Sequence, residues 1–110
     1  MKKTLFSLAL LAAFACSTAV LADEPEFTIV IKNNRFEPSE ITVPAGKRVK
    51  LVIHNQDATA EEFESHDLQR EKVIAGNSMG TVWVGPLVAG SYAFVGEFHE
   101  DTAKGTLVAK

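Results

Sequence analysis

The chain has 110 residues, with 11 basic and 14 acidic side chains and 46% hydrophobic content. One domain is expected at this length, and the ordinary apolar fraction excludes a disordered or collagen-like chain. The excess of acidic residues, without any run of Lys or Arg, argues against binding to nucleic acid or to an anionic membrane.

The N-terminal segment has the pattern of a secretory signal. Lys2 and Lys3 precede an apolar run over residues 5–15, and Ala22 supplies the small residue expected at a cleavage site. We therefore predict a signal peptide over 1–22, a domain over 23–110 and a bacterial periplasmic location. Later apolar stretches are too short to span a membrane. The residues before Cys16 suit lipid attachment poorly, so a lipoprotein is not expected.

Removal of this segment changes the charge and the chemistry. Nine basic and 14 acidic residues remain, a net charge of −5, and the only cysteine, Cys16, is lost. The predicted exported chain then has no thiol for a disulfide, an iron–sulfur cluster or a copper–thiolate bond. Serine-nucleophile elbows, phosphate loops and HExxH or CxxC motifs are absent, so hydrolytic catalysis is not expected.

Most of the remaining chain alternates apolar and polar residues with period two, which predicts strands. Turn residues such as Pro44, Gly46, Gly85 and Gly90 separate the runs. Short strands at this spacing predict an all-β sandwich. The segment 55–67 lacks clear alternation, and we expect a loop with a helical turn around 60–63. The alternating runs lie at 27–31, 41–43, 49–53, 82–84, 92–98 and 107–109.

Two acidic segments carry the candidate chemistry. In residues 96–101, GEFHED, Glu97 and His99 would share one face of an extended backbone, opposite Phe98. In residues 61–67, EEFESHD, Glu62 and Glu64 would share a face while Phe63 points inward. Carboxylate and imidazole ligands suit iron, copper(II) or zinc. Each segment also fits a solvated charged loop, and parity alone does not decide which of Glu61, Glu62 and Glu64 is a ligand.

Other candidates have simpler explanations. His66 is a further possible ligand, although a lone loop histidine is usually surface decoration. Met79 follows a Gly-Asn-Ser turn, and packing in the core is favoured over a ligand role. His54 is expected at the surface. Arg70 and Lys72 are expected to pair with the acidic residues.

Three segments together resemble a cupredoxin over nearly the whole predicted domain. Residues 34–46, NRFEPSEITVPAG, are similar to the opening F-x-P-x-x-I-x-V-x-x-G of that fold, and 49–57 resembles a strand leading to an N-x-D turn. Residues 90–108 resemble the closing G-x-Y-x-F-x-C-x-x-H…M-x-G-x-L-x-V ligand loop. The resemblance implies a Greek-key β-sandwich with a metal site at one end.

The departures from the cupredoxin pattern concern the copper ligands. Blue-copper sites use two His, a Cys thiolate and an axial Met. Gly96 stands at the Cys position, Ala103 is near the Met position, and the first His position falls within 61–64, so that only His99 remains. A type 1 copper site is therefore not expected.

A narrower resemblance is to the EfeO-type cupredoxin-like domains, including small periplasmic cupredoxins of the FtrB kind. It rests on residues 62–65, 70–74 and 96–105. This resemblance implies a role in bacterial iron uptake beside a ferric permease or another periplasmic partner. With it added, Glu62 and Glu64 are expected to meet Glu97 and His99 at one end of the sandwich, as ligands of an iron or copper ion.

Three functions follow as hypotheses. The first is a periplasmic protein that binds Fe(II) and passes it on or oxidises it, with a bound copper or a partner as electron acceptor. The second is a copper(II) carrier that uses His99, His66 and Met79. The third is a metal-free module whose acidic end docks a basic partner.

Overall fold

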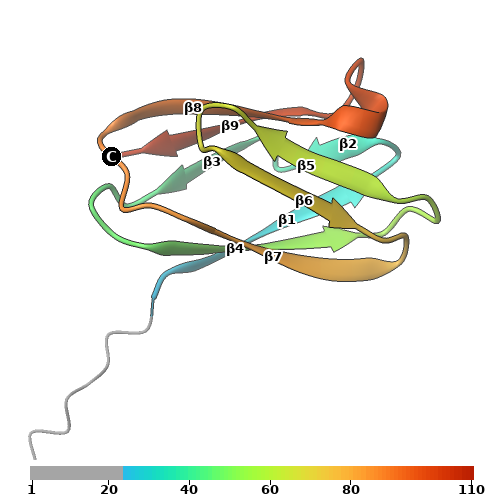
Figure 1. The fold of residues 1–110 in the computed structure, drawn as a ribbon, viewed down its shortest axis with the longest axis horizontal. Helices are drawn as coiled ribbons and strands as arrows, with labels where there is room; N and C mark the ends of the chain where they lie inside the picture. The colour runs from blue at the N-terminus through green and yellow to red at the C-terminus, as the bar shows by residue number, and fades with distance from the viewer. Residues whose placement is uncertain (1–23) are drawn as a thin grey trace, which may run out of the picture.

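The computed structural model describes residues 24–110, so the predicted signal peptide and Cys16 lie outside the described residues. These residues form nine strands and one short 3₁₀ turn, η1 (Figure 1). The elements are β1 (Glu26–Lys32), β2 (Arg35–Glu37), β3 (Glu40–Val43), β4 (Val49–Asn55), β5 (Glu61–Ser65), β6 (Arg70–Ile74), β7 (Ser78–Val84), β8 (Gly90–Gly96), η1 (Glu97–His99) and β9 (Lys104–Ala109).

The strands form two sheets packed face to face. One sheet has the order β2-β1-β4-β7 and the other the order β3-β9-β8-β5-β6. β1 pairs with β4 and β3 with β9 in parallel, while the other pairs are antiparallel. The predicted all-β sandwich of two packed sheets is confirmed. No helix within residues 24–110 is long and apolar enough to cross a membrane.

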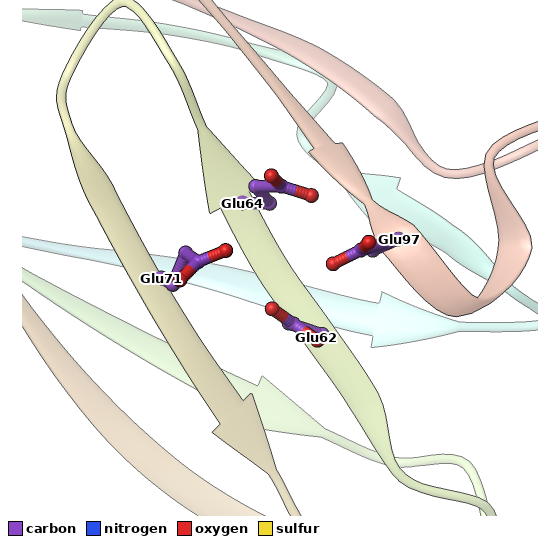
Figure 2. Close-up of side chains that lie close together, drawn as sticks. All are labelled: Glu62, Glu64, Glu71 and Glu97. Atoms are coloured by element: carbon purple, nitrogen blue, oxygen red, sulfur yellow. The ribbon is translucent and has the colours of Figure 1, made fainter.

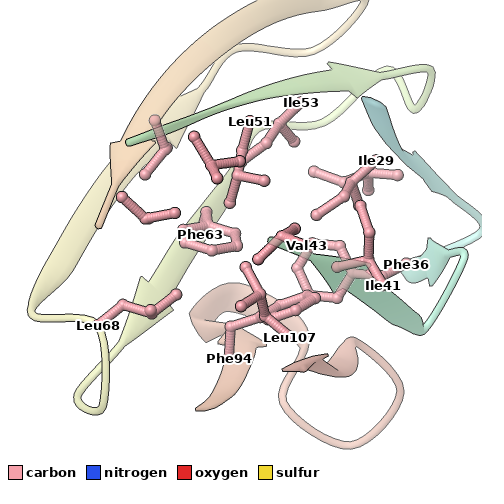
Figure 3. Packing of buried hydrophobic residues seen from close by; sticks show 14 of the residues in the cluster. Ile29, Phe36, Ile41, Val43, Leu51, Ile53, Phe63, Leu68, Phe94 and Leu107 are labelled. Carbon is pink, nitrogen blue, oxygen red and sulfur yellow. The ribbon is translucent and has the colours of Figure 1, made fainter. Parts of the chain in front are cut away.

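The core lies between the sheets, where the inward side chains of both interdigitate (Figure 3). The alternation predicted for β1, β3, β4 and β7 is confirmed, since their inward members are buried. Three aromatic rings form its centre: Phe36 contacts Phe63 and Phe94 edge-on, and Phe63 lies 5.1 Å from Phe94 between ring centroids.

One end of the sandwich is held together by polar groups. Asn33 and Asn34 form the two-residue turn between β1 and β2 with positive φ, and the Asp57 carboxylate accepts hydrogen bonds from both backbone N–H groups. Asn55 is fully buried, and its side-chain amide donates to the carbonyls of Thr59 and Ile74. These bonds fix the loop that leads into β5.

Two local predictions are wrong. The expected helical turn around 60–63 is instead the start of β5. The alternating run predicted over 92–98 does not reach Phe98, which is 52% exposed because the η1 turn interrupts the strand alternation after Gly96.

Candidate functional site

β5 sends neighbouring carboxylates to opposite sides of its sheet. Phe63 points into the core and is fully buried, and Glu61, with the same parity, is 1% exposed. Glu62 and Glu64 have the other parity and lie on the outer face of the sheet. The prediction that Glu62 and Glu64 share a face, with Phe63 inward, is confirmed.

The outer face gathers four carboxylates. Glu62 and Glu64 come from β5, Glu71 from the edge strand β6 and Glu97 from η1 (Figure 2). One oxygen from each lies within 4.8 Å of the others. Glu71 stands directly opposite Glu64 in the β5–β6 ladder, which explains why these two meet. We call these four residues the outer-face carboxylate group.

The crowding changes the acidity of two members of the group. Partial burial raises the pKa of Glu62, and the neighbouring Glu97 and Glu71 charges raise it further. The pKa of Glu64 is raised first by hydrogen bonding with the Glu97 side chain, then by partial burial and by the nearby carboxylates, while His66 opposes the shift. The full negative charge on this face is thus unfavourable without a counter-charge.

We expect Glu64→Gln to stabilise the metal-free domain at pH 7. The raised pKa values mean that, just above the ordinary value of 4.5, the native state binds more protons than the unfolded state. The contribution of Glu62 and Glu64 to the free energy of unfolding therefore falls as the pH rises from 4.5 through their raised pKa values. The gain in free energy of unfolding of Glu64→Gln over the unmodified protein should shrink as the pH falls toward 4.5. Urea unfolding of both proteins at several pH values measures this difference. An advantage that does not change with pH would contradict this explanation.

A second arrangement lies on the inner side of β5. The Glu61 carboxylate accepts hydrogen bonds from the backbone N–H of Phe98 at 2.9 Å and of Glu62 at 3.1 Å. Its other oxygen lies 2.5 Å from His99 Nδ1. A buried carboxylate is tolerated when its lone pairs are satisfied in this way. Glu61 shares the inward parity of Phe63, but its charge gave no reason to expect that it is buried.

The predicted ligands are thus divided between two places. Glu62, Glu64 and Glu97 come together, but on the outer face of a sheet and not in loops at one end of the sandwich, and they are joined by Glu71, which we did not predict. His99 is not a member of the group, since its Nδ1 faces Glu61. The extended backbone assumed for Glu97 and His99 is wrong, because both lie in η1.

The remaining candidates lie elsewhere. The His66 side chain is 94% exposed, with Nε2 3.6 Å from Glu64 Oε1. Met79 lies on β7 opposite His54 and is 64% exposed, so the expectation that it packs in the core is wrong. Arg70 donates to the carbonyls of Trp83 and Gln69 and forms no ion pair with the group.

The comparisons with known proteins identify the family. A family model described as "Cupredoxin-like domain" matches residues 5–109, and the chain belongs to this family. The uncharacterized protein RP394 of Rickettsia prowazekii (strain Madrid E) is 43% identical over 83 residues. That alignment covers 76% of this chain and 66% of the relative, slightly less than two thirds of its length.

Solved structures share the fold at low identity. The metal-binding domain of the Cu(I)-exporting P-type ATPase CopA of Streptococcus pneumoniae D39 aligns with a TM-score of 0.68 and 14% identity, covering 77% of this chain and 84% of that one. Auracyanin A, a blue copper protein from Chloroflexus aurantiacus, aligns with a TM-score of 0.66 and 18% identity, covering 77% and 98%. These similarities establish the sandwich and its topology.

The space between the sheets beside Gly96, where a cupredoxin would hold type 1 copper, does not suit that metal centre in this protein. A Cβ atom at Gly96, the Cys position, would lie 2.7 Å from Glu61 Cδ and 2.6 Å from the Ala103 Cβ. The space that a thiolate would need is therefore filled by the Glu61 carboxylate and Ala103. Gly96 and Ala103 supply neither the thiolate nor the thioether of a type 1 site, and the space for a thiolate is already occupied.

Proposed function

We propose that this protein binds iron on its outer face and handles Fe(II) in the periplasm for a bacterial ferrous-iron uptake system. The observation that carries the proposal is the convergence of four carboxylates from β5, β6 and η1 within 4.8 Å. Oxygen ligands favour hard cations, and an iron ion among them would offset the repulsion between the carboxylates, which adds to the effects of burial on the pKa of Glu62 and of hydrogen bonding with Glu97 on the pKa of Glu64. The EfeO-type resemblance supports iron as the cargo.

The role of the site is to hold and pass on the cation. Glu62 and Glu64 are fixed by the β5 ladder, whereas Glu71 lies on an edge strand and Glu97 on a turn, so iron would enter and leave from the open outer face. Oxidation of Fe(II) to Fe(III) releases one electron, which a bound copper or a partner protein would have to accept. A periplasmic donor or an iron permease is the corresponding partner.

An anaerobic Fe(II) titration tests the proposal. The protein, purified from the periplasm of a bacterial host, is expected to bind one Fe(II) per chain, and Glu64→Gln or Glu97→Gln should weaken binding at least tenfold. Glu40→Gln is the matched control, because it makes the same change of charge on edge strand β3 of the same sheet. Equal affinity in all four proteins would rule out the outer-face carboxylate group.

Copper(II) is the second candidate cargo, favoured by the position of His66 beside Glu64. An imidazole and carboxylates together suit Cu(II). The other members of the predicted copper set, His99 and Met79, lie on other elements. Because copper outcompetes iron at most such sites, relative affinity does not separate the two. Loss of cellular ferrous-iron uptake on deletion supports iron, and copper sensitivity alone supports copper. The third outcome is that the outer-face carboxylate group binds no cation and instead docks a basic partner protein.

A further inference from the structure

The position of Glu97 depends on how η1 is attached to the sheet. β5 and β8 pair only at Phe63–Gly96 and Glu64–Val95, so the ladder ends where η1 begins. The turn itself is closed by backbone bonds, among them Gly96 N–H to the Ala103 carbonyl and Ala103 N–H to the His99 carbonyl. These bonds shape the turn, but they do not tie it to β5.

The Glu61 side chain makes the connection to β5 that the ladder lacks. One Glu61 oxygen accepts a hydrogen bond from the Phe98 N–H, which belongs to the peptide that joins Glu97 to Phe98. The other oxygen contacts the imidazole of His99, two residues after Glu97. Both ends of η1 are thereby held from the inner side. Since Glu61 is 1% exposed, this link is sheltered from water and costly to leave unpaired.

Glu97 needs such a restraint because its neighbours repel it. Its carboxylate stands among Glu62, Glu64 and Glu71, and a free turn would move it away into water. The bare Cα of Gly96 lets the Glu61 carboxylate come close, since a Cβ there would lie 3.0 Å from Glu61 Oε1. One strand thus carries a cation ligand, Glu62, on one face and the residue that places another ligand on the opposite face.

We propose that Glu61 is a positioning residue that holds Glu97 in the outer-face carboxylate group by binding the Glu97–Phe98 peptide and His99. This inference rests on the proposed function, because it concerns the geometry of the same cation site. Glu61 is not one of the four carboxylates of that group. Its side chain fills the space beside Gly96 and fixes the position of the Glu97 carboxylate on the outer face.

The test uses Mn²⁺, followed by its electron paramagnetic resonance signal, on protein purified from the periplasm. Glu61→Ala should weaken Mn²⁺ binding about tenfold without changing any ligand. Glu61→Gln keeps an oxygen for the Phe98 N–H and should stay within about threefold of the unmodified protein. This rescue separates positioning from a long-range effect of charge, since both variants remove the same charge. Equal weakening in both would overturn positioning.

Two further variants guard against a general loss of folding. Thr102→Val removes a different attachment of the same loop, the hydroxyl bond to the Asn34 carbonyl, and should leave Mn²⁺ affinity unchanged. If Glu61→Ala does not fold, Glu61→Asp replaces it, because the shorter side chain withdraws from the Phe98 N–H. Unchanged affinity in a folded Glu61→Ala or Glu61→Asp would refute the positioning role. Failure of the unmodified protein to bind Mn²⁺ or Fe(II) would refute the proposed function instead.

Discussion

Replacing Gly96 by cysteine is expected to destabilise the domain by about 3 kcal/mol and to create no copper–thiolate centre. A Cβ at this position would lie 2.6 Å from the Ala103 Cβ and 2.7 Å from Glu61 Cδ, closer than side-chain atoms approach one another. The cysteine must displace a buried carboxylate that binds two groups of η1, the Phe98 N–H and the His99 ring. Urea unfolding gives the loss of stability, and visible absorption after addition of Cu(II) shows whether a thiolate binds.

The control variants make this prediction specific. Ala89→Cys places a thiol at an exposed position before β8 and should leave stability unchanged. In the double variant Glu61→Gly/Gly96→Cys, the clash with Glu61 is removed and only the contact with Ala103 remains, so the cost should be smaller than the sum of the two single changes. A stable Gly96→Cys protein with strong copper–thiolate absorption would contradict the structure of this end of the sandwich.

Phe63→Ala is expected to lower the free energy of unfolding by about 3–5 kcal/mol and the melting temperature by about 15 °C or more. The ring is fully buried at the centre of the core and contacts both Phe36 and Phe94. A cavity would form directly beneath the two outward glutamates of β5.

Phe98→Ala is the matched control for this change. It removes the same side chain from a position that is 52% exposed and leaves the backbone N–H in place. It should cost less than about 1 kcal/mol. Comparable losses in the two variants, measured by thermal unfolding, would show that the aromatic cluster is not the centre of the core.

Period-two alternation predicted most of the fold, because strands with one buried face bury every second residue. It did not identify the start of β5 as a strand, because Glu61 puts a charged residue at an inward position. A charged residue there conflicts with the pattern of a strand, so the segment has the composition of an acidic loop. What permits its burial is the Phe98 N–H and His99, which lie more than 35 positions away in the chain.

Part of the candidate site could also be predicted. Parity placed Glu62 and Glu64 on one face, and the cupredoxin resemblance brought them toward Glu97. Glu71 was missed because β6 is an edge strand with little burial and no alternation. Its position follows from the β5–β6 hairpin, in which Ser65 pairs with Arg70 and Glu64 with Glu71. Recognising residues 61–74 as a hairpin would have supplied it. His99 was grouped with Glu97 because an extended backbone was assumed where the chain makes a 3₁₀ turn.

The most direct test of the proposed iron site is to locate the cation. Crystals of the protein soaked anaerobically with Fe(II), measured at the iron absorption edge, should show one anomalous difference peak between the carboxylates of Glu62, Glu64 and Glu97, with Glu71 beside it. The same peak should be absent from Glu64→Gln crystals treated in the same way. A peak between the sheets beside Gly96, or no peak on the outer face at saturating Fe(II), would contradict the proposal that this domain carries iron on its outer face.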